Sequence, residues 1–305
     1  SRAELRAAAS RIRFQLGQAD RFKAGLARSG RWKPYIEQVF AEKGVPRELA
    51  ALPHVESSFD PTAYSKVGAA GLWQFTRSTG LRYMQIDHIV DERRDPFLST
   101  HAAAQLLSDN YSVIQSWPLA ITAYNHGLAG MRRAAEQQDT TDIGVIVRNY
   151  KSRIFGFASR NFYAAFLAAV DVDANYERYF GPLELDSPEN LAAIVTPDYV
   201  EASTVAHALN VPVSELQRLN PALMETVWAG EKLVPRGFEL RVPLRADADP
   251  TTLLASIPND ARFAAQRPDV QHRVRSGETL SVIAQRYHVS VASLIRANSR
   301  INRGF

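Results

Sequence analysis

The stretch Leu52-Pro53-His54-Val55-Glu56-Ser57-Ser58-Phe59 places a carboxylate among apolar residues. A helix with 3.6 residues per turn would carry Leu49, Leu52, Glu56 and Phe59 on one side. Three of these side chains are apolar and form a core-facing stripe, and the fourth is a carboxylate. Burial disfavours the charged form of a carboxyl group, so we expect the pKa of Glu56 to be raised. A carboxylic acid that stays protonated near neutral pH can act as a general acid.

Glu56 also has a structural interpretation. The carboxylate can be held by an arginine such as Arg47 or Arg77, and structural ion pairs perturb pKa values as well. The helical pattern alone does not separate a proton donor from a paired carboxylate, so the rest of the sequence has to decide.

Size and composition indicate an ordinary globular protein. The 305 residues are enough for about two domains. Hydrophobic residues make up 46% and charged residues 22%, and no apolar run approaches the roughly 18 residues that span a bilayer. The first residues, Ser1-Arg2-Ala3-Glu4, resemble the interior of a longer chain, so we expect any export or membrane-anchoring segment to lie outside this sequence.

Charge and motifs exclude several classes of function. The net charge of +4 is spread along the chain without an Arg/Lys stripe, so we expect no nucleic-acid partner. The absence of cysteine rules out disulfides and thiolate chemistry. The seven histidines show no paired metal-ligand spacing, and there is no glycine-rich phosphate loop, so we expect neither a metal nor a nucleotide cofactor.

The first part of the chain, to about residue 176, reads as mostly helical. Helices are expected from Leu5, over 35–43, over 48–59 with a kink or late start at Pro53, from Ser99 or Thr100 to 114, from Pro118 to about 126, and over 161–170. The last of these is strongly apolar, which predicts a central buried helix.

The second part contains an internal repeat. Residues 203–220 align without a gap to residues 281–298, at a constant shift of 78. Each copy reads as two short helices, and a strand over 239–243 follows the first copy. The chain ends at the residue that matches Phe238, so we expect the closing strand of the second copy to lie outside this sequence. Residues 244–270 have the composition of a linker.

Three ordered motifs resemble those of the lytic transglycosylases, bacterial enzymes with a goose-type-lysozyme-like helical fold. They are Glu-Ser-Ser at 56–58, Ser-Lys-Val-Gly-Ala-Ala-Gly-Leu-Trp-Gln-Phe at 65–75 and Ala-Tyr-Asn-His-Gly at 123–127. The resemblance covers roughly residues 20–170 and is most specific to the membrane-bound lytic murein transglycosylase D family. The repeat resembles LysM modules, which bind N-acetylglucosamine-containing glycans; the second copy has the more typical opening at 272–280 and the first is degenerate.

This resemblance implies an α+β multidomain protein. A mainly α-helical, lysozyme-like catalytic domain over 1–179 would be followed by small βααβ LysM-like modules. The first module would cover 180–245, a linker 246–270, and the second module, truncated before its last strand, 271–305. The resemblance also implies a periplasmic protein that acts on peptidoglycan glycan strands and is attached to the outer membrane through a segment absent from this chain.

The implied reaction cleaves the β-1,4 bond between N-acetylmuramic acid and N-acetylglucosamine. Glu56 would act as general acid and then as base, so that the muramic acid C6 hydroxyl attacks C1 and leaves a 1,6-anhydro end. Most glycosidases use two carboxylates. The candidates for a second one read as a turn or helix cap (Asp60, Asp95) or as a solvated, salt-bridged loop (Asp91, Glu92). A hydrolytic muramidase and a catalytically inactive peptidoglycan-binding protein remain the alternatives.

The resemblance also supplies substrate-binding residues. Ser65, Gln74, Tyr124 and Asn125 would contact the sugars, with Tyr124 orienting Glu56 and Asn125 binding an acetamido group. Loop and cap hydrogen bonds are the structural alternative for Ser65, Gln74 and Asn125. The tyrosine of a fourth family motif falls on Phe162 in the gapless alignment, and the neighbouring Tyr163 is taken as the site residue.

Nearby aromatic and histidine side chains have simpler roles. We expect Phe75 to pack in the core, whereas Trp73 can stack on a sugar face or join the core. A structural role is expected for His126, which lies between Asn125 and Gly127.

Overall fold

The computed structural model describes residues 18–244, 249–269, 271–287 and 289–298. They form two compact units. The first contains the described residues up to 86 together with 90–192 and 220–222, and the second contains 87–89, 193–219 and the described residues from 223 onward. The predicted boundaries at 179, 245 and 270 stay predictions.

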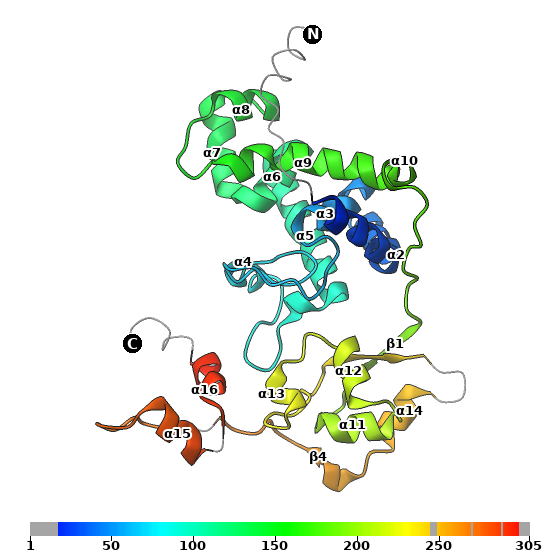
Figure 1. Cartoon of the computed structure of the whole chain (residues 1–305), viewed down its shortest axis with the longest axis vertical. Coiled ribbons are helices and arrows are strands. Elements are labelled where there is room, and N and C mark those ends of the chain that lie inside the picture. Colours follow the sequence, from blue (N-terminus) through cyan, green and yellow to red (C-terminus); the bar gives the residue numbers. More distant parts are fainter. Residues whose placement is uncertain (1–17, 245–248, 270, 288, 299–305) are drawn as a thin grey trace. The chain divides into compact units, whose positions relative to one another are not determined.

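The first unit is built from helices (Figure 1). They are α2 (Ala19–Glu42), the 3₁₀ turn η1 (Arg47–Ala51), α3 (Leu52–Glu56), α4 (Arg77–Gly80), η2 (Glu92–Arg94), α5 (Pro96–Ile114), α6 (Trp117–His126), α7 (Leu128–Gln138), α8 (Ile143–Asn149), α9 (Phe157–Ala174) and α10 (Tyr176–Phe180). The helix expected from Leu5 lies outside the described residues. The one expected over 35–43 is the second half of α2, which runs through Pro34 because Ile36, Val39 and Phe40 continue its buried face.

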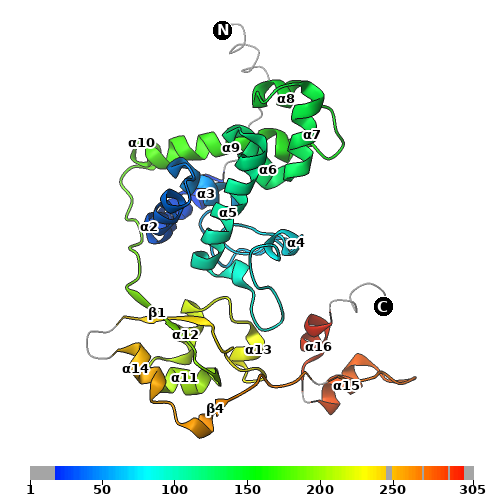
Figure 2. The same ribbon diagram turned by 180° about the vertical axis from the view of Figure 1, so that it is seen from behind.

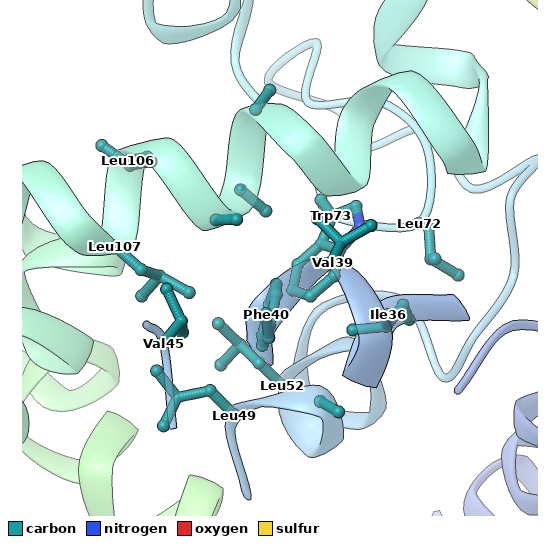
Figure 3. Packing of buried hydrophobic residues seen from close by; sticks show 14 of the residues in the cluster. Ile36, Val39, Phe40, Val45, Leu49, Leu52, Leu72, Trp73, Leu106 and Leu107 are labelled. Carbon is teal, nitrogen blue, oxygen red and sulfur yellow. The ribbon is translucent and has the colours of Figure 1, made fainter. Parts of the chain in front are cut away.

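One hydrophobic core holds α2, η1, α3 and α5 together. Figure 3 shows part of this cluster, with the ring of Phe40 near Trp73 and the side chains of Leu49, Leu52 and Leu107 around them. The rings of Phe40 and Trp73 lie 5.6 Å apart, and both side chains are fully buried. Burying each large apolar side chain contributes about 1.5–3 kcal/mol to stability, so this cluster fixes the helix that carries Glu56.

Two predicted helices need correction. Helix α5 begins at Pro96, where the Asp95 carboxylate accepts hydrogen bonds from the Phe97 and Leu98 amides; the predicted caps, Ser99 and Thr100, are buried inside its first turns. Helix α9 packs along α6 and α3 (Figure 2), but only one face of it is buried. Leu167 is 48% exposed, and Ala164 and Ala168 are exposed with it on the face of α9 that no other described element covers.

The second unit carries the repeat. Strand β1 (Leu191–Val195) pairs with β3 (Glu239–Pro243), which forms at the predicted position. Between them lie β2 (Tyr199–Val200), α11 (Ala202–Ala208), α12 (Val213–Leu219) and α13 (Glu225–Trp228). The second copy contains α15 (Leu280–Arg286) and α16 (Val291–Ala297). These two helices begin 78 residues after α11 and α12, so the repeat is structural as well as sequential.

The segment expected to be a linker contains secondary structure. It includes α14 (Pro250–Ala255), η3 (Asn259–Ala261) and β4 (Arg262–Phe263), and β4 pairs antiparallel with β2. Arg262 also donates to the Asp198 carboxylate at 3.1 Å. No helix among the described residues is long and apolar enough to cross a membrane.

Candidate active site

Glu56 is the last residue of a very short helix. Helix α3 has only five residues, with Pro53 in its first turn, so the late-start prediction is confirmed and η1 precedes it. The chain then turns sharply, because Ser58 and Phe59 both have left-handed backbone angles (φ 55° and 56°). Phe59 is fully buried, but it reaches the core from this turn and not from a continuous helical stripe. The turn leaves Glu56 at the end of an element held by core packing.

The carboxyl group of Glu56 makes no hydrogen bond or ion pair with any residue that the structure describes. Arg47 pairs with Glu37 at 2.7 Å, and Arg77 donates to the Ile86 carbonyl oxygen at 2.9 Å. The interpretation of Glu56 as a carboxylate paired with either arginine is therefore wrong. Burial of the carboxyl group raises its pKa from 4.5 to about 8, while the residue as a whole keeps partial contact with solvent. Glu56 can thus hold a proton at neutral pH and still meet a ligand.

Tyr124 lies within electrostatic reach of Glu56. Burial, and to a smaller extent the charge of Glu56, hold the pKa of the Tyr124 hydroxyl well above its usual value. The hydroxyl donates its hydrogen bond to the Trp73 carbonyl oxygen at 2.8 Å, not to Glu56. We therefore correct the expectation that Tyr124 orients Glu56 by a direct hydrogen bond: it contributes a wall near the carboxyl group and ties α6 to the loop at Trp73.

The 63–75 loop contains two predicted sugar-binding residues, Ser65 and Gln74, and is folded by its own polar groups. Isolated bridges join Tyr64 to Ala70 and Ala70 to Phe75. The Ser65 hydroxyl accepts a hydrogen bond from the Ala69 amide at 2.9 Å. Gln74, whose backbone is left-handed (φ 48°), donates from Nε2 to the carbonyl oxygens of Ala63 and Gly71, which leaves Oε1 without a hydrogen bond to the described residues. The loop-building alternative for Ser65 and Gln74 is thus present in the structure.

Arg93 holds the 63–75 loop in place by hydrogen bonds to its backbone, a role that the sequence did not reveal. Arg93 and Asp91 are almost fully buried and form a two-point ion pair, with Nε–Oδ1 and Nη2–Oδ2 distances of 2.8 and 2.7 Å. Nη1 donates to the carbonyl oxygens of Gly68 and Phe75 at 2.8 and 3.1 Å. A Cβ atom on Gly71 (φ +77°) would lie 1.9 Å from the Arg93 carbonyl oxygen, so only glycine fits there. This charged run is salt-bridged, as predicted, but Asp91 and Arg93 are buried, so the prediction that the run is solvated is wrong.

The other candidate carboxylates all have structural partners. Asp60 accepts from the amide and hydroxyl of Thr62, Asp95 caps α5, and Glu92 accepts from the Gln85 amide at 2.7 Å. Asp60 and Asp95 therefore take the turn and cap roles expected of them.

Asn125 and Tyr163 lie on two packed helices, α6 and α9. Asn125 is exposed, and its Oδ1 accepts from the Ser159 hydroxyl at 3.1 Å; His126 contacts the same hydroxyl through Nδ1 at 3.2 Å. Tyr163 is partly buried against the core, whereas its neighbour Phe162 is buried within it.

Two aromatic side chains of the predicted loop belong to the core. Trp73 is fully buried and donates from Nε1 to the Thr100 hydroxyl at 2.9 Å, so it cannot stack on a sugar. Phe75 is buried as expected.

A cavity of about 200 Å³ lies elsewhere in this unit. Its lining comes from α2, α9, α10 and the following segment, including Lys33, Glu37 and Asp173, and Glu56 is not part of it. Among the described residues, no group of three or more His, Asp or Glu side chains is arranged to hold a metal ion.

Two family models match the chain. The transglycosylase SLT domain matches residues 35–147, which include Glu56, Ser65, Gln74, Tyr124 and Asn125. The LysM domain matches residues 272–304, the second copy of the repeat. Together with the observed elements, these matches confirm the predicted fold class, a helical lysozyme-like domain followed by small α+β modules.

Individual relatives share these features. Membrane-bound lytic murein transglycosylase D of Escherichia coli, from two strains, is 30% identical over 284 residues, which cover 88% of this chain and 60% of the relative. This chain thus spans about three fifths of the length of these relatives. Among solved structures, the lytic transglycosylase Slt of Pseudomonas aeruginosa aligns with a TM-score of 0.40 and 19% identity, covering 50% of this chain and 25% of that one. The 70 kDa soluble lytic transglycosylase of Escherichia coli gives 0.39 and 21%, covering 49% and 24%.

Proposed function

The chain carries the SLT domain of the lytic transglycosylase family and a LysM domain, and on this premise we propose that it cleaves peptidoglycan by transglycosylation. The bond broken is the β-1,4 link between N-acetylmuramic acid and N-acetylglucosamine, and the product is a 1,6-anhydromuramic end. The proposal rests on the carboxyl group of Glu56, which makes no hydrogen bond or ion pair within the described part of the chain and whose pKa is raised to about 8.

The first step is proton donation. With a pKa of about 8, roughly nine tenths of the Glu56 side chains are protonated at pH 7. The carboxylic acid gives its proton to the glycosidic oxygen as the bond to C1 breaks, and N-acetylglucosamine leaves as an alcohol. Positive charge then develops at C1, where the acetamido oxygen of the same sugar shields it.

The second step reuses the same side chain. Glu56, now a carboxylate, takes the proton of the C6 hydroxyl while that oxygen bonds to C1. No water is consumed, and Glu56 ends the cycle protonated, as it began. The nucleophile belongs to the reacting sugar, which lowers the entropic part of the barrier and removes the need for a carboxylate that activates water. The structural engagement of Asp60, Asp91, Glu92 and Asp95 supports this one-acid route.

The remaining site residues would position the glycan. The Nδ2 group of Asn125 and Oε1 of Gln74 make no hydrogen bond to the described residues, so both can bind sugar or acetamido groups. Ser65 can offer its hydroxyl hydrogen, since that oxygen acts only as an acceptor within the loop. Tyr124 and Tyr163 would supply the walls beside the carboxyl group.

The proposed activity also implies where in the cell the protein works. The LysM-like modules would hold N-acetylglucosamine-containing strands, and the substrate implies a periplasmic location.

The decisive experiment identifies the product ends. Purified peptidoglycan is digested with the protein and analysed by mass spectrometry, which separates anhydro ends from ends that have gained one water. We expect anhydro ends from the wild type, and about a thousandfold slower formation of them from Glu56→Gln. Glu48→Gln, the same chemical change at an exposed position in η1, serves as the control and should cleave normally. Reducing muramic ends would instead establish a hydrolytic muramidase, and a protein without any product would be the inactive binding protein.

A further inference from the structure

We propose that residues 151–157, the 151–157 patch, bind the peptide carried by muramic acid, next to the site for the glycan strand. The inference rests on the proposed function and deepens it, because it assigns a second part of the substrate to a second surface. The patch reads Lys-Ser-Arg-Ile-Phe-Gly-Phe and contains no acidic residue.

The patch combines free cations with exposed hydrocarbon. Lys151 and Arg153 are exposed and form no ion pair or hydrogen bond with any described residue. Ile154 is 62% exposed and Phe157 is 73% exposed, which is high for large apolar side chains only three residues apart. Apolar side chains gathered in this way on a surface are typical of binding sites.

The backbone that presents these side chains is fixed. The Arg160 guanidinium donates to the carbonyl oxygens of Val147 and Tyr150 at 2.6 Å and of Phe155 at 3.1 Å. It also lies 5.4 Å from the centre of the Phe155 ring, which is buried. A ligand therefore meets side chains whose backbone is already ordered, and little entropy is lost in ordering the loop.

The patch adjoins the proposed substrate residues. The Phe155 ring packs edge-on against His126, at 5.0 Å between ring centres, and Ile154 is its neighbour in the chain. Ser159 joins His126 to Asn125 by hydrogen bonds of 3.2 and 3.1 Å. Phe157 and Tyr163 lie on α9 about 9 Å apart along the helix axis and about 120° apart around it. Ser159 lies one turn before Tyr163 on the same face, so the patch at the start of α9 meets the Asn125 and Tyr163 side at its edge. A muramic sugar beside Tyr163 and Asn125 would thus have its substituent within reach of the patch.

The chemistry of the peptide matches the patch. Peptidoglycan peptides end in carboxylates and carry alanine methyl groups, so they offer anions to Lys151 and Arg153 and hydrocarbon to Ile154 and Phe157. Charge complementarity of this kind favours one orientation of a ligand over others. A bare glycan strand offers the patch neither carboxylates nor alanine side chains.

The test measures binding in Glu56→Gln protein, which is expected not to consume its ligand. Two ligands are compared: glycan strands that carry peptides, and the same strands after an amidase has removed the peptides. The test variants are Lys151→Ser with Arg153→Ser, and Phe157→Ser. The matched controls are Lys43→Ser with Arg132→Ser, which changes the net charge equally at exposed positions, and Leu167→Ser, an exposed apolar residue on the same helix.

We expect the double charge variant to bind peptide-bearing strands about fivefold to tenfold more weakly, with a smaller loss at high salt. Phe157→Ser should weaken the same binding by about fivefold. Stripped strands should bind equally well to test and control variants. Equal losses on stripped strands, or no loss on either ligand, would overturn the proposal. Selective loss of binding to anionic phospholipid vesicles would also overturn it and identify a membrane-facing patch. The end groups made by the wild-type protein test the proposed reaction separately. The proposed reaction and the proposed role of the 151–157 patch can therefore each be contradicted without the other.

Discussion

Two carboxyl groups of the helical unit lie close to α3 and have opposite surroundings. Glu56 is the last residue of α3 and has no hydrogen-bond or ion-pair partner among the described residues. Asp173, on α9, accepts a hydrogen bond from Nε2 of His54 at 3.0 Å and pairs with Lys33. His54 lies on α3 only two residues before Glu56. The same short helix therefore contacts the paired carboxylate of Asp173 through His54 and also carries Glu56, whose carboxyl group has no partner among the described residues.

The pKa values of the two groups move in opposite directions. Burial alone raises the pKa of Glu56 to about 8. Burial acts in the same direction on Asp173, but the hydrogen bonds from His54 and Lys33 outweigh it and hold the Asp173 pKa below its usual value. Burial also lowers the pKa of His54. Its Nδ1 is buried and has no hydrogen-bond partner among the described residues, so the neutral ring carries its proton on Nε2.

The difference separates a stabilising carboxylate, Asp173, from the proposed proton donor, Glu56. Asp173 ties α9 to α2 and α3 while the His54 ring stacks on Phe22 with 4.5 Å between ring centres. This arrangement holds α3 in place. Glu56 sits at the end of the element so fixed, and its own lack of partners keeps the proton available. Four measurements test this difference between Glu56 and Asp173.

The largest effect is expected on catalysis. The isosteric change Glu56→Gln removes the transferable proton, and general acid–base catalysis is worth up to about 10³–10⁴-fold, so the cleavage rate should fall about a thousandfold. Asp173→Asn should keep most of the rate per folded molecule, because Asp173 transfers no proton. Initial rates of release of soluble fragments from peptidoglycan measure both. Similar losses in the two variants would show that Glu56 acts through the fold and not through chemistry.

The next effect is a loss of stability in Asp173→Asn. The variant leaves the Lys33 ammonium group without its main partner in a partly buried position, and breaking such a pair typically costs about 3 kcal/mol. Denaturant unfolding at pH 7 measures the change in the free energy of unfolding. Because the Asp173 pKa is lowered, its contribution to stability is present above the unfolded pKa of about 4 and is lost as the pH falls through the folded pKa. Wild type and variant should therefore converge in acid, and a constant difference down to low pH would contradict the ion-pair account.

Glu56→Gln should instead raise stability, by an amount that grows with pH. Between the unfolded pKa of 4.5 and the folded pKa of about 8, the folded wild type keeps a proton that the unfolded chain has released, so wild-type stability falls as pH rises. The glutamine variant has no proton to lose. With allowance for the partial solvent contact of Glu56, we expect it to be more stable by on the order of 2 kcal/mol at pH 9, and equal to wild type near pH 4. Thermal unfolding at several pH values between about 4 and 9 measures this difference in stability. Glu48→Gln is the control and should be as stable as the wild type at each pH.

Much of the fold could be read from the sequence because it depends on local signals. Pro53 and Pro118 mark the starts of α3 and α6, and the 78-residue repeat predicts the helix pairs of the second unit. The predictions that were wrong concern residues whose partners lie far away in the sequence. The buried Asp91–Arg93 pair supports a loop some twenty residues earlier, so its charges look solvated when only neighbours in the sequence are considered.

For the candidate site, the sequence likewise predicted some features and not others. The polar residues that the sequence singles out lie on α3, α6, α9 and the 63–75 loop. The raised pKa of Glu56 was predicted correctly, although the helical stripe behind that prediction ends at Glu56 and Phe59 reaches the core from a turn. The partner of the Tyr124 hydroxyl could not be predicted, because it is a backbone carbonyl oxygen, that of Trp73, and every residue has one. Whether Phe162 or Tyr163 faces the substrate stays a prediction, since a step of one residue on a helix turns a side chain by about 100°.

The smallest expected effect is the change of kcat/KM with pH. It is also the effect that best separates the one-acid route from a two-carboxylate mechanism. If Glu56 alone moves protons, kcat/KM depends only on its protonated form, so it should fall above a pKa of about 8, to about one tenth of the plateau at pH 9. Below pH 7 the profile should stay flat until the Asp173 ion pair is lost in acid, because no carboxylate has to be ionised before the reaction starts. A hydrolase with a second, ionised carboxylate would give a bell-shaped profile with an acid limb near pH 4–5 while the protein is still folded. Initial rates on soluble glycan strands between pH 4 and 9.5, with circular dichroism at each pH to confirm folding, distinguish the two: an acid limb in folded protein would mean that a second carboxylate takes part, and Glu56 would no longer suffice for both proton transfers.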